Sequence, residues 1–246
     1  MLLTVARSGI LFVCATLPSF AQSLPHHDIL RTNDKIEIDG KLDEPSWRQA
    51  PAVGEFHFNW WKTGPKESTV AKLLWNDENL YVGFYCHDRN ISAKVVERHG
   101  PVSLDDSVEA FISPNIGKIR NYYGFEINVI GTMLNFIKAD WYKGPFHWEP
   151  ADVRYKTSFH GLPVKNDSPD DQHWILELAI PFKNFEKDAP HTPPRENDTW
   201  RLNLNRAGGT TNGQYSTWSP ISTEKPNFHV PEAFGWVRFV NRIAGK

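Results

Sequence analysis

The sequence predicts an all-β protein, a two-sheet antiparallel β-sandwich of jelly-roll or immunoglobulin-like type with short helical turns. Many short segments alternate apolar and polar residues, which is the pattern of strands that bury one face. Glycine, proline, asparagine and aspartate separate these segments, as they do at turns between strands. No long segment shows the periodicity of a helix, and this combination is typical of a sandwich. The 246 residues, 40% of them hydrophobic, are enough to build one well-buried core.

The N-terminal residues have the composition of an export signal. Arg7 precedes an apolar run, and Ser19-Phe20-Ala21 forms a small-x-small cleavage site before Gln22. The apolar run is too short to span a bilayer, so we expect no transmembrane segment. We therefore predict a secreted or periplasmic protein with a signal peptide at residues 1–21, a mature N-terminal segment at 22–35 and a single domain at 36–246.

The content of charged residues, cysteine and tryptophan shows which kinds of partner and cross-link to expect. The formal net charge is -2, which gives no general attraction to nucleic acid. After cleavage Cys86 is the one remaining cysteine, so we exclude an internal disulfide and expect a buried thiol. The 10 tryptophans are an unusual number, and aromatic residues are enriched where a partner binds. In the core we expect Trp47, Trp174, Trp200, Trp218 and Trp236.

The first half of the domain contains short strands around tight turns. Residues 36–39 alternate and run into the turn dipeptide Asp39-Gly40. Asp43 is placed to cap a helical turn that begins near Pro45. Residues 70–75 and 80–86 flank a polar turn and predict a hairpin. We also expect a strand at 56–61 and a short helix at 93–98.

A central hairpin at residues 104–134 organises the polar residues. Its two strands each place apolar side chains on one face and polar side chains on the other. The polar face carries Glu109, Glu126 and Asn128 beside aromatic residues, which suits the recognition of a polyol such as a sugar. If the hairpin closes symmetrically around Gly117-Lys118, Glu109 faces Glu126 on the neighbouring strand.

The second half continues with short strands. Residues 139–148 are rich in aromatics without a clear period and predict an ordered loop. Strands are expected at 153–159, 173–180, 200–206 and 235–240, with a helical turn at 182–185. In the strand at 200–206, leucines point to one side while Asn203 and Asn205 point to the other.

Eight segments in this order resemble the family nine carbohydrate-binding modules. The segments are IDGKLDEPSW, LLWNDENLYVGF, DDSVEAF, YYGFEIN, WILELAIPF, TWRLNLNR, STWSP and PEAFGWVRF. The resemblance covers nearly the whole predicted mature chain and implies a two-sheet β-sandwich. It also implies sugar binding between two aromatic rings, structural calcium and an association with glycoside hydrolases.

The resemblance assigns only part of that family's site. The family's glutamate matches Glu109, its asparagine matches Asn128, and an aromatic residue before the final strand matches Phe228. Two positions differ. The first aromatic residue of the family falls near Ser103, and its arginine falls on Glu126.

The leading hypothesis is a non-catalytic carbohydrate-binding protein that works beside separate glycoside hydrolases. Polar side chains would bind hydroxyl groups, and Phe228 would cover one face of a sugar ring. A second ring could come from the loop Trp141–Trp148 or from Trp60 and Trp61. The predicted ligand-binding residues are Glu109, Glu126, Asn128, Trp141, Trp148, Asn203, Asn205 and Phe228.

Three alternatives stay open at this point. An opposed Glu109 and Glu126 pair would also suit a hydrolase of O-glycosyl bonds, which we rank below binding. Asp88, Asp105 and Asp106 lie at strand ends and could hold a structural calcium ion, which prefers several oxygens. The aromatic residues could instead meet a protein partner in the cell envelope.

Overall fold

The computed structural model describes residues 23–139, 146–161, 171–208 and 214–244. The predicted signal peptide and Trp141 therefore lie outside the described residues, as does most of the loop expected at 139–148. Within the described part, no helix has the length and apolar composition needed to cross a membrane.

Strands dominate the fold, as the sequence predicts. They are β1 (His26–Arg31), β2 (Thr69–Trp75), β3 (Asn79–His87), β4 (Asp106–Ser113), β5 (Tyr122–Asn128), β6 (Met133–Lys138), β7 (Phe146–His147), β8 (Arg154–His160), β9 (His173–Pro181), β10 (Thr199–Gly208), β11 (Tyr215–Thr217) and β12 (Gly235–Ile243). The helical turns are α1 (Pro45–Gln49) and the 3₁₀ turns Val102–Leu104, Ile116–Lys118, Phe182–Phe185 and Pro231–Ala233.

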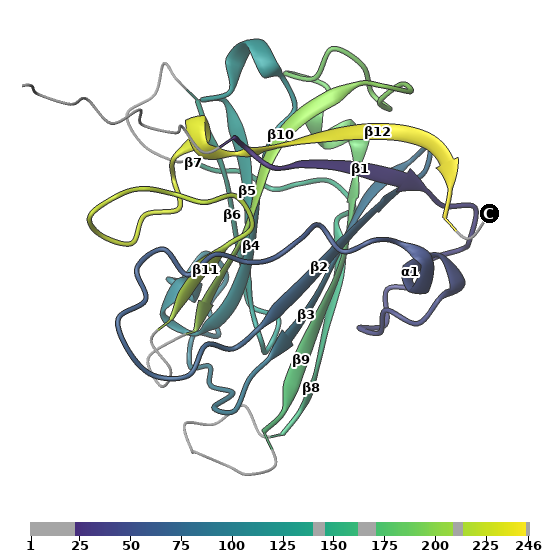
Figure 1. Ribbon diagram of the computed structural model, residues 1–246. Helices are drawn as coiled ribbons and strands as arrows, with labels where there is room; N and C mark the ends of the chain where they lie inside the picture. Colours follow the sequence, from purple (N-terminus) through teal and green to yellow (C-terminus); the bar gives the residue numbers. More distant parts are fainter. Residues whose placement is uncertain (1–22, 140–145, 162–170, 209–213, 245–246) are drawn as a thin grey trace, which may run out of the picture.

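The strands form one strongly curled sheet whose two halves face each other (Figure 1). One half has the order β7-β6-β5-β4-β10 and the other β2-β3-β9-β8, with β12 and β1 joining them. Apolar side chains of β4, β5 and β10 meet those of β2, β3 and β9 in one large core cluster. The predicted β-sandwich is confirmed, but the halves are continuous, and β1 pairs in parallel with both β12 and β2.

Strand β1 lies in the segment that we placed before the domain. Its residues pair with β12 from His26 to Arg31, and Leu30 and Arg31 also pair with β2. The sequence pattern does not reveal this strand, because His26, His27 and Asp28 interrupt any apolar alternation. Backbone hydrogen bonding to strands far along the chain creates it.

Three predicted elements are wrong, and in each case other hydrogen bonds replace the regular ones. Residues 36–39 form no strand, because the backbone amides of Asp39 and Gly40 donate to Glu177 on β9. Residues 56–61 contain only an isolated bridge between His57 and Thr217. Residues 93–98 form no helix, because the amides of residues 94 and 95 donate to the Asp105 carboxylate.

The core contains most of the expected aromatic residues. Trp47, Trp174, Trp200 and Trp218 are buried, and Cys86 is a buried free thiol whose pKa burial raises to about 12. Trp236 is the exception, since it is only partly buried. Its ring stacks on His26 with a centroid distance of 6.0 Å, and the Arg201 guanidinium lies 4.6 Å from its centre.

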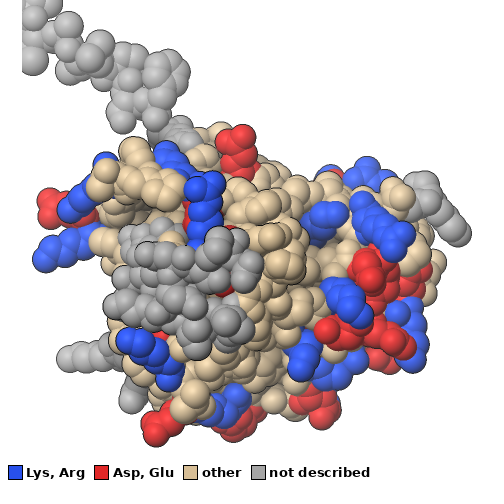
Figure 2. Space-filling model, turned by 90° about the horizontal axis from the view of Figure 1, so that it is seen from below, with Lys and Arg blue, Asp and Glu red and all other residues tan. Residues whose placement is uncertain are grey.

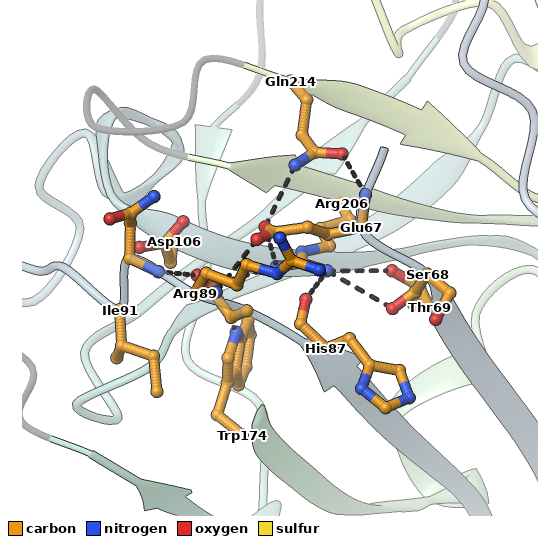
Figure 3. A network of polar contacts seen from close by, with 12 residues as sticks. Glu67, Ser68, Thr69, His87, Arg89, Ile91, Asp106, Trp174, Arg206 and Gln214 are labelled. Carbon is orange, nitrogen blue, oxygen red and sulfur yellow. Dashed lines mark hydrogen bonds and ion pairs between the residues drawn. The ribbon is translucent and has the colours of Figure 1, made fainter. Parts of the chain in front are cut away.

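A buried ion cluster crosses the interior between the two halves (Figure 3). Arg206 of β10 shares a face with the core residue Val108, so its guanidinium points inward. Its Nη2 lies 2.9 Å from Asp88 Oδ2 and 3.6 Å from Glu67 Oε2, and Nη1 donates to the His87 carbonyl at 2.7 Å. The side chains of Arg206 and Asp88 are fully buried.

Replacing Arg206 by alanine should therefore destabilise the protein strongly. The change leaves Asp88 and Glu67 buried without their cation, which typically costs about 3–5 kcal/mol of unfolding free energy. Urea unfolding of R206A against the parent protein measures this. R238A is the matched control, because its ion pair with Asp28 is largely exposed and its loss should matter much less. A cost for R206A no larger than that of the control would contradict the assigned role.

Candidate functional site

The outer face of β4, β5 and β10 is covered by the segment between β11 and β12. Arg201 of β10 holds this segment, because its Nε donates to the Phe234 carbonyl at 2.7 Å and its Nη2 to the Glu232 carbonyl at 3.0 Å. Gly124 of β5 leaves room for the Phe136 ring, which any side chain there would overlap. The result is an apolar cluster outside the sheet, made of Phe111, Tyr122, Phe136, Ile221, Phe228 and Phe234.

A cavity of about 260 Å³ lies at the edge of this outer cluster. Its floor comes from adjacent strands, which contribute Glu109 of β4 and Glu126 of β5. Its other described lining residues are Ser103, Leu104, Tyr215, Pro226, Asn227, Phe228 and His229. Two acidic side chains and an aromatic ring therefore meet in one hollow.

The two glutamates face each other directly, as the symmetric hairpin predicts. Glu109 pairs with Glu126 on one side and with Asn205 of β10 on the other. The Asn205 Nδ2 donates to Glu109 Oε2 at 3.3 Å, while the Asn205 Oδ1 is buried and has no hydrogen-bond partner among the described residues. Glu109 is 3% exposed and Glu126 is 6% exposed, so both carboxyl groups are largely withdrawn from water.

Burial makes the charged form of both groups unfavourable. It raises the pKa of Glu126 to about 7. The pKa of Glu109 lies well above its usual range, first because of burial and second because of the charge on Glu126, against a smaller opposing effect of the Asn205 hydrogen bond. A shared proton or a nearby cation would relieve this pair.

Aromatic residues form one wall of the cavity. The Phe228 ring lies 5.7 Å from the Trp60 ring and 6.0 Å from the Tyr215 ring, measured between centroids. Trp60 supports the wall from behind, since its indole N–H donates to the Thr223 carbonyl at 2.7 Å. Trp60 and Trp61 both line a neighbouring groove of about 650 Å³, which shares Tyr215 and Pro226 with the cavity.

The structure brings some predicted site residues together and leaves others apart. Glu109, Glu126 and Phe228 line the cavity, and Asn205 contacts it through Glu109. Trp148 packs on the inner side of the sheet against core tyrosine and phenylalanine rings. The predicted ligand role of Trp148 therefore has no geometric support.

Asn128 and Asn203 are occupied by the protein itself. Asn128 donates to the Val95 carbonyl and Asp105, and accepts from the Thr132 amide. Asn203 donates to the Ser219 carbonyl and accepts from the amides of residues 204 and 219. Both are fully buried and neither lines the cavity, so their amides fix loops instead of reaching a ligand.

Sequence reasoning missed five lining residues: Leu104, Tyr215, Pro226, Asn227 and His229. Asn227 and His229 flank Phe228, so their position beside a predicted ring was an available signal. Leu104 follows Ser103, the position where the resemblance places a ring, and it offers an exposed apolar side chain there. Tyr215 precedes the STWSP segment, and nothing local distinguishes it.

The three aspartates predicted to hold calcium do not fit such a site. Asp88 accepts from Arg206, from the Trp174 indole and from a backbone amide. Asp105 accepts from two backbone amides and Asn128, and Asp106 from the amide and hydroxyl of residue 92. In the described parts of the chain, no group of three or more acidic, histidine or cysteine side chains is arranged to hold a metal ion.

The other hollows that the structure describes do not combine two opposed carboxyl groups with an aromatic wall. A larger cavity of about 710 Å³ lies around Asn79, Arg154 and Lys183, but its one aromatic residue, Phe182, is buried in the core. Figure 2 shows one face of the molecule, on which basic and acidic side chains are intermixed and no large area has a single sign. The opposed glutamates and the aromatic wall therefore mark the small cavity as the candidate site.

Comparisons with known proteins agree with the resemblance. Residues 51–239 match the sequence model of carbohydrate-binding family 9. A structure described as a candidate carbohydrate-binding protein from Bacteroides uniformis matches with a TM-score of 0.74 and 21% identity, covering 88% of this chain and 100% of that one. A comparison with curated proteins gives no match.

Two further structures show the same fold with bound sugars. They are a family 9 carbohydrate-binding module from Caldicellulosiruptor kristjanssonii with cellotriose and one from the same organism with glucose. The cellotriose complex has a TM-score of 0.60 and 16% identity, and covers 87% of this chain and 94% of that one. The glucose complex has a TM-score of 0.58 and 16% identity, with coverages of 87% and 96%. At sequence identities of 16–21%, the similarity to these three structures supports the fold alone.

The raised pKa of Glu126 predicts a dependence of stability on pH. An unfolded glutamate has a pKa of about 4.3, whereas in the folded protein the pKa of Glu126 is about 7. The folded state therefore binds a proton that the unfolded state has released, and stability must fall as pH rises through this window.

Glu126→Gln removes this titration, so its urea midpoint should fall less between pH 5 and pH 8 than that of the parent protein. Glu177, whose pKa is also about 7, contributes equally to both proteins. Glu224→Gln, on the exposed rim of the neighbouring groove, should behave like the parent. An equal pH dependence in E126Q and the parent would refute the assignment.

Proposed function

The chain belongs to carbohydrate-binding family 9, and from this premise we propose that it binds a carbohydrate in the cavity of Glu109, Glu126 and Phe228 without cleaving it. One observation carries the assignment to this cavity. Two buried polar groups from adjacent strands lie beside an aromatic ring supported from behind, in a hollow of about 260 Å³. That volume suits a single sugar unit better than a long segment of polymer.

Each part of the cavity has a role in this proposal. The Phe228 ring would cover the apolar face of a sugar ring, as aromatic planes do. The glutamates would exchange hydrogen bonds with hydroxyl groups, since a carboxyl group accepts them when ionised and can also donate one when protonated. Asn205 would act as a positioning residue, since it holds Glu109 from the side away from Glu126.

Binding is a better use of this geometry than catalysis. A glycosidase keeps its two carboxyl groups in contrasting environments, so that one is protonated while the other is ionised. Here burial is the first cause that raises the pKa of both Glu109 and Glu126. Neither carboxyl group has a charged partner among the described residues that would keep one of them ionised while the other stays protonated.

We expect Glu109→Ala combined with Phe228→Ala to abolish carbohydrate binding. Loss of a central aromatic contact and of a buried hydrogen-bonding carboxyl group should weaken the affinity at least about a hundredfold. Calorimetric titration with glucose and cellotriose measures the change. Phe159→Ala is the matched control, because Phe159 is an exposed phenylalanine on β8, outside the cavity.

Unchanged affinity in the double variant would move the site elsewhere. Failure of the parent protein to bind any member of a panel of mono- and oligosaccharides would contradict carbohydrate binding at this cavity. A protein partner in the cell envelope would then become the leading function.

We also propose that the protein is exported and assists polysaccharide breakdown by separate hydrolases. The charged residue, apolar run and small-x-small site of residues 1–21 support export. Intact mass of protein recovered from outside the cytoplasm should correspond to a chain that begins at Gln22. A recovered chain that still begins at Met1 would contradict the cleavage.

A further inference from the structure

The charges of the cavity are all of one sign. Glu109 and Glu126 are its acidic residues, and none of its described lining residues is a lysine or arginine. His229 supplies no charge at neutral pH, because burial and the neighbouring Lys138 lower its pKa to about 4. The site therefore presents two carboxyl groups and no cation of its own.

Glu126 is an unpartnered polar group in this cavity. It is 6% exposed and lines the hollow, yet it has no hydrogen bond or ion pair with any described residue. Its cross-strand neighbour is another acid, Glu109, for which Asn205 is the one hydrogen-bond donor among the described residues. A buried carboxyl group in this position requires either a proton or a cation from outside the protein.

Other buried acidic side chains of the protein have ion-pair or hydrogen-bond partners. Asp88 and Glu67 have the Arg206 guanidinium between them. Glu177, also fully buried, accepts hydrogen bonds from the amides of residues 39 and 40 and from the Trp47 indole. Glu126 has no cation or hydrogen-bond donor of this kind among the described residues, and like Glu109 it faces the cavity.

A protonated amine fits this pair better than the other cations. An ammonium group has three donors and can bind two opposed carboxylates at once. A calcium ion takes six to eight oxygen ligands, and the described residues contain no group of three or more metal-binding side chains. A neutral sugar can donate hydrogen bonds but cannot neutralise the pair.

We propose that the cavity is built for a carbohydrate with a positively charged amine, such as a glucosamine unit. The amine would lie between Glu109 and Glu126, with the sugar ring against Phe228. This inference rests on the proposed carbohydrate-binding function and names the class of sugar that the site selects.

The test compares glucosamine, glucose and N-acetylglucosamine by calorimetric titration of the full protein at pH 7. Buried or desolvated charge pairs contribute enough for glucosamine to bind at least about tenfold more tightly than either neutral sugar. Glu126→Gln should remove this preference, and Glu126→Arg should reverse it in favour of glucose. Glu224→Gln, an equal change of charge outside the cavity, should leave the preference intact.

The possible results separate this inference from the function on which it rests. Binding of glucose and glucosamine with equal affinity overturns the amine assignment and leaves carbohydrate binding in place. A preference that survives Glu126→Gln, or that disappears with a metal chelator, also overturns it. Binding of none of the three sugars overturns the proposed function itself.

Discussion

The ion cluster around Arg206 is the constraint on which the rest of the structure depends. It lies inside the sandwich, where Arg206 of β10 meets Asp88 at the end of β3, so it links the two halves of the curled sheet. Its charges are completely buried, and buried charges tolerate little displacement from their partners. The position of β10 relative to β3 is therefore fixed from within.

That constraint reaches the candidate site through strand geometry. Successive residues of a strand point to opposite faces, so Arg206 points inward while Asn205 points outward, where it contacts Glu109. Two residues further back, Asn203 binds the backbone of Ser219, and Arg201 binds the carbonyl of Phe234. One strand thus anchors the core on one side and the segment that carries Phe228 on the other.

The sequence predicts the strand residues of the site, Glu109 and Glu126, better than the lining residues that come from loops. Alternation and a central turn are local properties, and they place Glu109 opposite Glu126 in the register that the structure has. They also place Asn128 and Asn203 correctly on strands, but they cannot show that loop backbones occupy both amides. Strand β1 depends on pairing with segments far along the chain, which has no local signature. Tyr215 pairs with Ala207 of the preceding strand, but that pairing does not mark it as a lining residue.

In the proposed site, an acid at position 126 affects which ligands the cavity rejects as well as which it accepts. Specificity is a difference between affinities, and a repulsive element contributes to it as much as an attractive one. An acidic sugar in the proposed site would bring another carboxylate beside two carboxyl groups whose charged forms burial already makes unfavourable. In the proposed binding mode the Phe228 ring would meet only the apolar face of a sugar ring, so it would not distinguish neutral, acidic and amino sugars. Discrimination by charge would then come from the two glutamates, while the ring would contribute affinity common to all three classes.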